Sequence, residues 1–278
     1  TMVSIVSEFG NYGDLYKKYL IPYGPRHDST NALYADTTTG LLGTFPFGDT
    51  TALGPDPSPE STLIEIVTRG YLLCGVQPRL GFASLDPNDN TTWVGFDVEL
   101  CHGIAAALFQ GKEDHVQFVD VFAADGSTTT SDNMYEFLAN GTVDVVARAH
   151  VTLQAMYSEP TTGQAFDFSI PYFYDNNSSR IDHLDAYALM TRDNDPQWSK
   201  FVYWLVMGLI YAEERGITSS SSIEMPAVSL FGNDFLQMMR DCVFAIGSYG
   251  DVYNRTMEEF VRRAGPNKLH KDAHSPLH

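Results

Sequence analysis

Hydrophobic and polar residues follow one another along this chain in blocks that predict helices and strands in turn. Residues 62–69 have the apolar spacing of a helix, with Ser61 as its N-cap and Gly70 just past its end. Residues 71–76 form a short apolar run, typical of a strand that is buried on both faces. Helical spacing returns at 96–109. This alternation continues over most of the chain.

The later blocks keep the same rhythm of strand and helix. Strands are predicted at 116–122, 143–149, 166–175 and 185–192, and helices at 134–141, 196–214, 233–246 and 250–263. Strands that alternate with helices favour parallel pairing through right-handed crossovers. The pattern therefore predicts an α/β fold built on a layered sheet.

The two ends of the chain carry the same motif. Residues 9–20 read FGNYGDLYKKYL and residues 246–257 read IGSYGDVYNRTM, so both contain G-[NS]-Y-G-D-[LV]-Y. Both copies are followed by a Gly-Pro pair and by Asn-x-Leu, and aligning Gly10 with Gly247 gives a period of 247 − 10 = 237 residues. Such self-similarity indicates one full unit plus a duplicated tail, as in a tandem array.

This repetition divides the chain into four predicted parts. Residues 1–48 are the tail segment of an upstream copy, and residues 49–60, rich in Pro and Gly, are a linker. Residues 61–269 are the main α/β domain, and residues 270–278 are a C-terminal extension.

Composition and charge argue against two classes of protein, those that bind nucleic acid and those that span a membrane. The chain has 278 residues, of which 44% are hydrophobic, so it can bury a sizeable core. With 17 basic and 35 acidic side chains its net charge is −18, which has the wrong sign for nucleic-acid binding. The longest apolar run, at 201–212, falls short of the roughly 20 residues that a membrane-spanning helix needs. We therefore expect no nucleic-acid partner and no membrane span.

The three cysteines, Cys74, Cys101 and Cys242, allow at most one internal disulfide. They form no C-x-x-C pair, and buried free thiols are the favoured interpretation. The oxygen-rich segments 86–92 and 192–198 do not follow the calcium-loop pattern. We expect no metal and no cofactor.

Five Asn-x-Ser/Thr sequons predict glycosylation and a secretory route of the eukaryotic type. Their acceptors are Asn90, Asn140, Asn176, Asn177 and Asn254. The alternative is a polar surface, rich in Asn and Thr, that matches the short motif by chance.

The order of several segments resembles the extracellular solute-binding proteins of family 3, and within it the general L-amino-acid-binding proteins of bacterial ABC transporters. The matching segments are STLIEIVTRGYLLCGV, WVGFDVELCHGIAAALF, VDVVARA, FDFSIPYFYD, DPQWSKFVYWLVMGLIYAEERGI and IGSYGDVY. The resemblance implies the periplasmic-binding-protein-like fold of type II, in which two α/β lobes close over a small polar ligand. The family has a whole second lobe where this chain has only residues 176–184. We therefore expect a single lobe, with the second one deleted.

The resemblance also identifies candidate ligand contacts. In the family, an Arg in a Thr-x-Arg context shortly after the strand at 143–149 holds the ligand carboxylate, but this chain has Ala155 or Met156 there. Arg148 and His150 lie at the carboxyl end of that strand, where open α/β sheets place ligands, and Phe82 matches the family's aromatic loop. These three residues form a predicted remnant anion site. The alternative is a solvated strand end in which Arg148 pairs with a nearby carboxylate.

Three functions remain open at this point. The first is a secreted solute-binding-like module without a classical amino-acid clamp, which meets a small polar ligand outside the cell or at its surface. The second is a structural or adhesive repeat that assembles head-to-tail with copies of itself or with neighbouring repeats, through its duplicated tail. The third, a dehydratase-like enzyme, is disfavoured because the dehydratases that the resemblance brings in work between two lobes, and no G-x-S-x-G or H-E-x-x-H motif indicates another enzyme class. We therefore predict a protein that is not an enzyme.

Overall fold

The computed structural model describes residues 56–122, 133–175, 185–264 and 267–268. The chain divides into two units, and the fold below is that of the unit Ala52–Arg263. The predicted domain boundaries at 48–49 and 269–270 lie outside the described residues and stay predictions.

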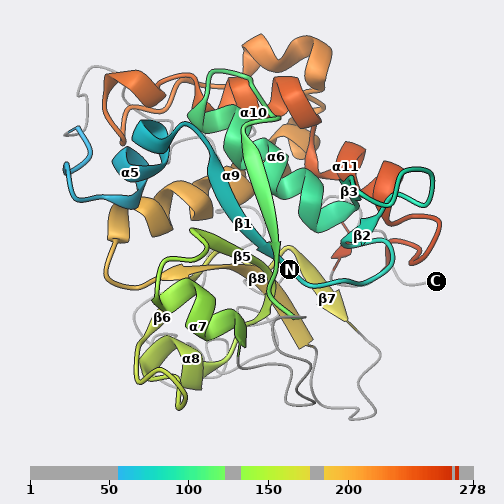
Figure 1. The fold of residues 1–278 in the computed structure, drawn as a ribbon. Helices are drawn as coiled ribbons and strands as arrows, with labels where there is room; N and C mark the ends of the chain where they lie inside the picture. Colours follow the sequence, from blue (N-terminus) through green and yellow to red (C-terminus); the bar gives the residue numbers. More distant parts are fainter. Residues whose placement is uncertain (1–55, 123–132, 176–184, 265–266, 269–278) are drawn as a thin grey trace, which may run out of the picture. The chain divides into compact units, whose positions relative to one another are not determined.

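A mixed sheet of six strands forms the centre of this unit (Figure 1). The strands are β1 (Leu72–Val76), β4 (Val116–Asp120), β5 (Val145–His150), β6 (Phe166–Phe168), β7 (Phe173–Asp175) and β8 (Asp185–Arg192). Their order is β4-β1-β5-β8-β6, and β7 also pairs with β8. β1 is parallel to β4 and β5, whereas β8 is antiparallel to β5, β6 and β7. The predicted parallel pairing is therefore confirmed for β1, β4 and β5. A separate two-stranded sheet joins β2 (Ser84–Leu85) to β3 (Trp93–Val94).

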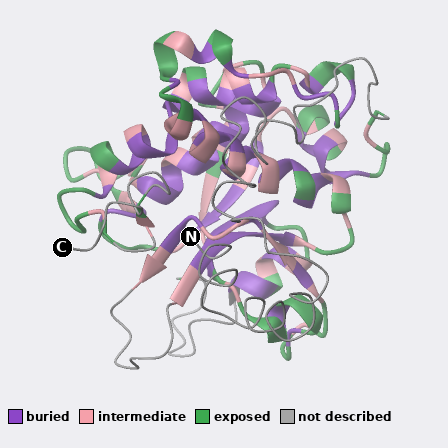
Figure 2. Cartoon of the chain, turned by 180° about the vertical axis from the view of Figure 1, so that it is seen from behind, coloured by how far each residue is buried: buried purple, intermediate pink, exposed green. Residues whose placement is uncertain are grey.

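Helices cover the sheet. They are α5 (Thr62–Arg69), α6 (Phe96–Leu108), α7 (Asn133–Ala139), α8 (Leu153–Tyr157), α9 (Pro196–Arg215), α10 (Met238–Ile246) and α11 (Tyr249–Thr256), with 3-10 turns η3 (Ser219–Glu224) and η4 (Asn233–Phe235). Figure 1 shows α6, α9 and α10 packed together, with α7 and α8 beside β5 and β6. Buried residues concentrate in the sheet and in the helix faces turned towards it (Figure 2). Within the described ranges, no helix combines the length and the apolar character needed to cross a membrane.

Local chemistry explains where the predicted helices begin and end. The Ser61 side chain accepts a hydrogen bond from the amide of Leu63, and Gly70 closes α5 in the left-handed conformation. Asp195 caps α9, Pro196 occupies its first position, and Gly216 ends it with φ +69°. These boundaries agree with the sequence predictions.

Three predicted elements differ from the structure. The expected helix 233–246 is divided into the 3-10 turn η4 and the helix α10, which begins only at Met238. The expected strand 166–175 is divided into β6 and β7, because Pro171 has no amide hydrogen to continue the ladder. The expected helix 250–263 ends at Thr256, and the chain then turns, with the Phe260 amide bonded to the Met257 carbonyl at 2.9 Å. α8, η3, β2 and β3 were not predicted, because elements this short give too little periodicity.

A disulfide joins Cys74 on β1 to Cys101 on α6. This corrects the preference for three free thiols, and Cys242 alone is free and buried. The two bonded residues meet because α6 packs directly on β1. A crosslink of this kind typically stabilises a domain by about 2–4 kcal/mol.

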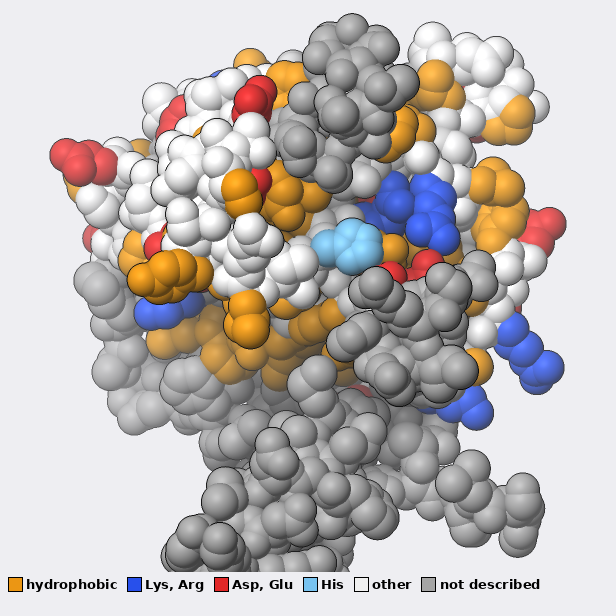
Figure 3. Space-filling view, turned by 90° about the horizontal axis from the view of Figure 1, so that it is seen from below, with side chains coloured by type: hydrophobic (Ala, Val, Ile, Leu, Met, Phe, Trp, Pro, Cys, Tyr) orange, Lys and Arg blue, Asp and Glu red, His pale blue; other side chains and the backbone are white. Residues whose placement is uncertain are grey.

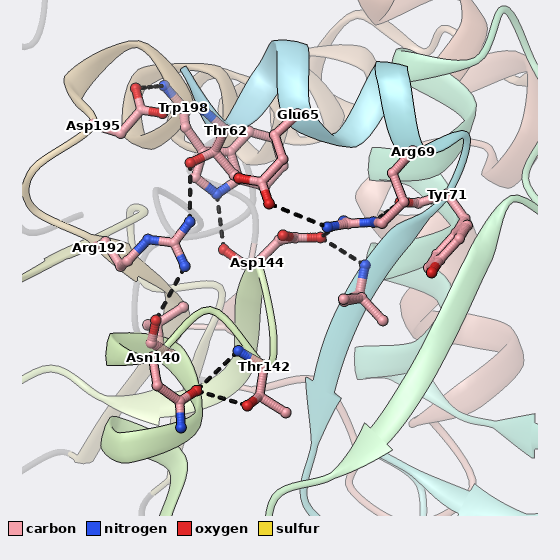
Figure 4. A network of polar contacts seen from close by, with 12 residues as sticks. Thr62, Glu65, Arg69, Tyr71, Asn140, Thr142, Asp144, Arg192, Asp195 and Trp198 are labelled. Carbon is pink, nitrogen blue, oxygen red and sulfur yellow. Dashed lines mark hydrogen bonds and ion pairs between the residues drawn. The ribbon is translucent and has the colours of Figure 1, made fainter. Parts of the chain in front are cut away.

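A polar network holds α5 and α9 against the sheet (Figure 4). The Asp144 carboxylate accepts hydrogen bonds from the Arg69 guanidinium and from the Leu73 amide. The backbone carbonyl of Asp144 accepts a further hydrogen bond from Trp198 Nε1 at 2.9 Å. Burial raises the pKa of Asp144, and these donors oppose the shift. Asp195 accepts hydrogen bonds from the Thr62 amide and the Trp198 amide, so one side chain caps two helices. The oxygen-rich segment 192–198 therefore has a structural role.

Candidate functional site

The carboxyl ends of β1, β4 and β5 meet at one edge of the sheet, because the three strands are parallel. Open α/β sheets bind their ligands at such an edge. Figure 3, which views the molecule from below, shows basic and acidic side chains gathered beside a histidine and hydrophobic side chains. Of the predicted residues, Arg148 and His150 lie at the carboxyl end of β5, and Phe82 lies beside Arg148.

Arg148 has an unusual backbone conformation for a strand residue. Its φ is +56°, and the pairing of β5 with β8 shifts register between Val146 and Ala149. A bulge of this kind re-aims a side chain, and a left-handed residue other than glycine costs about 1–3 kcal/mol. Here the guanidinium turns inward, where Nη2 donates to the Gln77 carbonyl at 2.7 Å. Surrounding contacts must hold Arg148 in this strained conformation.

Asp97, at the start of α6, provides the main contact. Its side chain is fully buried, and its Oδ2 accepts a hydrogen bond from Arg148 Nε at 3.1 Å. The hydroxyl of Tyr172 donates to Asp97 Oδ1 at 2.6 Å and accepts from the Arg148 amide at 2.7 Å. Burial raises the pKa of Asp97, and the charge of Arg148 opposes that shift. Asp97, Arg148 and Tyr172 thus form a buried, charge-compensated triad.

Phe82 lies against two cations. The Arg148 and Arg79 guanidinium carbons lie 5.2 Å and 5.4 Å from its ring centre, within cation–π range. The ring itself is buried and makes an edge-to-face contact with Phe173 at 4.9 Å. A molecule approaching from solvent meets Arg79 before Phe82, because the Arg79 side chain is 44% exposed.

Arg79 pairs with Asp175 at 3.3 Å, and neither residue was predicted as part of the site. His150 is exposed at the end of β5, and its ring contacts that of Tyr187 in a tilted arrangement, with 4.5 Å between ring centres. The Tyr187 ring in turn contacts that of Phe173 at 6.3 Å. Ring contacts therefore connect His150 to Phe82. We call Arg79, Phe82, Arg148, His150, Phe173, Asp175 and Tyr187 the edge cluster.

The edge cluster has the chemistry to hold a small zwitterion. A guanidinium grips a carboxylate through two parallel hydrogen bonds, and a carboxylate accepts from an ammonium group. Arg79 supplies the guanidinium for a ligand carboxylate, and Asp175 supplies the carboxylate for a ligand ammonium group. Arg148 is 7% exposed and already bound to Asp97, so its position suits support of the ring rather than contact with solvent.

A hollow lies beside the end of β5. It has a volume of about 370 Å³ and is lined by Tyr135, Thr152, Gln154, Ala155, Glu159, Pro160 and Thr161. Ala155, one of the two positions expected for the family's arginine, is buried, and Met156 is exposed. The Glu159 carboxylate is occupied by the amides of Thr161 and Thr162. This hollow therefore supplies no cation for a ligand carboxylate.

The other candidate groups are distributed over the surface. Asn90, Asn140 and Asn254 are exposed, whereas Asn176 and Asn177 lie outside the described residues. In segment 86–92, hydrogen bonds from Thr92 lower the pKa of Asp89 to about 2. No group of three or more His, Cys, Asp or Glu side chains that could hold a metal ion occurs in the part of the chain that the structure describes.

No protein-family model matches the chain. Over 131 residues it is 32% identical to the glutamate/glutamine/aspartate/asparagine-binding protein BztA of Rhodobacter capsulatus, a match that covers 47% of this chain and 34% of that protein. Over 98 residues it is 32% identical to the general L-amino acid-binding periplasmic protein AapJ of Rhizobium johnstonii, covering 35% of this chain and 26% of that protein. The chain thus spans about a third or less of the length of these relatives.

A solved structure supports the fold. An ABC transporter periplasmic binding protein from Brucella ovis with glutathione bound superposes with a TM-score of 0.58 and 19% identity, covering 76% of this chain and 94% of that chain. The sequence matches and this shared fold confirm the resemblance drawn from the segment order. The chain is therefore similar in sequence to amino-acid-binding periplasmic proteins, and its described unit has an α/β architecture consistent with a single lobe of the periplasmic-binding-protein fold.

Proposed function

We propose that this chain is an extracellular solute-binding module that presents the ligand edge of one lobe as an open surface. The observation that carries the proposal is the edge cluster, where an exposed Arg79 pairs with Asp175 beside a buried aromatic wall. Residues 176–184 are too few to form a second lobe that closes over this edge. Recognition therefore takes place without a clamp.

The ligand class follows from the two charges and from the relatives. An α-amino acid carries a carboxylate for Arg79 and an ammonium group for Asp175. The name of one relative, BztA, specifies glutamate, glutamine, aspartate and asparagine, so we propose an amino acid of this acidic or amide kind. A ligand on an open lobe stays largely hydrated, and each polar contact is weakened in high dielectric. We expect a Kd of the order of 1 mM or weaker, equivalent to about −4 kcal/mol or less favourable.

The division of roles within the edge cluster can be tested by mutation. Arg79 and Asp175 contact the ligand in our proposal, Phe82 forms the wall, Arg148 positions that wall, and His150 extends the same surface. In amide-resolved NMR titrations with L-glutamate, residues 77–82 and 148–150 should shift progressively. Arg79→Ala should abolish these shifts, whereas Lys112→Ala, which removes an exposed charge just before the amino end of β4 and so at the opposite end of the parallel strands, should leave them unchanged. Shifts absent from the unmodified protein, or equal in the two variants, would contradict the proposal.

An extracellular location and a binding role without catalysis belong to the same proposal. The Cys74–Cys101 disulfide supports an oxidising compartment, where such bonds persist. The name of one relative specifies a periplasmic protein, and both relatives are named as binding proteins. We expect no turnover of a bound amino acid.

Glycosylation is proposed at the exposed sequons. Asn140 presents its amide at the surface, where its Oδ1 accepts hydrogen bonds from the Thr142 amide and hydroxyl at 2.9 Å and 2.6 Å (Figure 4). Asn90 lies in an exposed turn with φ +55°. Secreted from a eukaryotic host, the protein should lose mass on treatment with an N-glycosidase, and Asn90→Gln and Asn140→Gln should each remove one glycan. An intact mass that equals the bare polypeptide would refute this.

A further inference from the structure

α11 shows which positions of the repeated motif make contact with the domain body. Tyr249, Val252 and Tyr253 are buried, as are the flanking Ile246 and Met257. The Tyr249 hydroxyl donates to the Tyr172 carbonyl at 2.5 Å. These contacts place α11 in a groove of the body, which we call the α11 groove, between Phe96, Tyr172 and Glu213.

The N-terminal copy of the motif keeps each buried position apolar or aromatic. In the order of the alignment, Ile246, Tyr249, Val252, Tyr253 and Met257 correspond to Phe9, Tyr12, Leu15, Tyr16 and Leu20. The residues that change in chemical type are at other positions: exposed Asn254 corresponds to Lys17, and half-buried Thr256 corresponds to Tyr19. The positions of α11 that face the groove are thus kept in residue class in the N-terminal copy.

The special backbone features of α11 are kept as well. Ser248 and Asp251 form a capping box at its start, and the corresponding residues of the copy, Asn11 and Asp14, are of types that favour the same helix start. Gly250 lies so close to Glu213 that a Cβ would be 2.4 Å from Oε1. Gly13 occupies the matching position. The copy therefore meets the tightest steric requirement of the groove.

The charge at the rim of the groove matches too. Arg255 of α11 forms an ion pair with Glu99 on α6. The corresponding residue in the N-terminal copy is Lys18, which keeps the positive charge. A docked copy would thus place an amine, rather than a guanidinium, beside Glu99.

We propose that residues 9–20 are a second ligand for the α11 groove and dock into the groove of another copy of this chain, in place of its own α11. Exchange of one segment for a near-equivalent one forms and breaks similar contacts, so it links subunits at low cost in free energy, as in domain swapping. Each chain offers one such segment and one groove. Docking is then head-to-tail, and it extends into a chain of subunits unless the ring closes. The proposal goes beyond amino-acid binding and does not depend on it.

A zero-length carbodiimide crosslink tests this in the unmodified full-length protein. Carbodiimide joins an amine to a carboxylate that it contacts, so Lys18 can be linked to Glu99 whereas Arg255 cannot. A mixture of ¹⁵N-labelled and unlabelled chains should give Lys18–Glu99 peptides that combine both isotopes. Lys17, which matches exposed Asn254, serves as the internal control and should not be linked to Glu99.

Two variants sharpen the result. Tyr12→Ala removes the aromatic side chain that matches Tyr249 and should reduce the Lys18–Glu99 crosslink strongly, and Gly13→Val should do the same by colliding with Glu213. Absence of the crosslink in the unmodified protein would overturn the proposal. The proposal would also be overturned if every Lys18–Glu99 crosslinked peptide pair carried a single isotope, because the segment would then dock on its own chain.

Discussion

Replacing Asp97 by alanine is expected to lower the free energy of unfolding by about 3–5 kcal/mol, because removing one partner of a buried ion pair leaves the other charge uncompensated. The partner here is Arg148, whose side chain is 7% exposed. The same substitution removes the acceptor for the Tyr172 hydroxyl. It also releases the contacts that hold Arg148 in its left-handed conformation.

Urea unfolding followed by circular dichroism measures this change. Glu65→Ala is the matched control, because the Glu65 side chain is 63% exposed and its pair with Arg69 spans one helical turn. Such surface pairs contribute about 0.3–0.5 kcal/mol. If the two variants lost similar stability, the triad would not be the support of the edge cluster that we describe.

Gly95→Ala is the second substitution with a large expected effect. Gly95 precedes α6 with φ +133°, and a Cβ there would lie 2.3 Å from the Phe82 carbonyl oxygen. We expect a loss of about 4 kcal/mol, of which ~1–3 comes from the backbone conformation and ~1–3 from the steric conflict. The conflict involves backbone atoms, which cannot move aside as a flexible side chain can.

Gly163→Ala separates the two contributions. Gly163 also has a positive φ, +67°, but nothing lies within 4 Å of its added Cβ. The Gly163→Ala variant should lose only the stability that the unfavourable backbone conformation costs, about 1–3 kcal/mol in the free energy of unfolding. Thermal or urea unfolding of both variants gives the difference, and equal losses would contradict a steric role for Gly95 in placing Phe82 and Asp97.

The regular elements were predictable because long periodic segments carry their own signals. Ser61 and Gly70 delimit α5, and Pro196 and Gly216 delimit α9, as the capping rules require. The division of the strand 166–175 was less accessible, since it depends on how Pro171 meets the ladder of β8. Pairing of Cys74 with Cys101 depends on α6 lying over β1, which spacing alone does not give.

The sequence could place Arg148 and His150 at a strand end, but it could not predict their contacts. The carboxyl end of the strand at 143–149 identified Arg148 and His150, and the structure places both in the edge cluster. The bulge that turns Arg148 inward leaves no sequence signal, because it arises from pairing with β8. Arg79 was missed, although the rule that identified Arg148 also applies to a cation just past the end of β1.

Calorimetric titration of the full chain with the twenty L-amino acids tests the central claim, an open single lobe, most directly. The account predicts no saturable heat at micromolar concentration for any of them. Heats of binding for glutamate, glutamine, aspartate and asparagine should arise only near millimolar concentration or above. A Kd in the low micromolar range for any amino acid would show that the ligand is enclosed, and it would contradict the account.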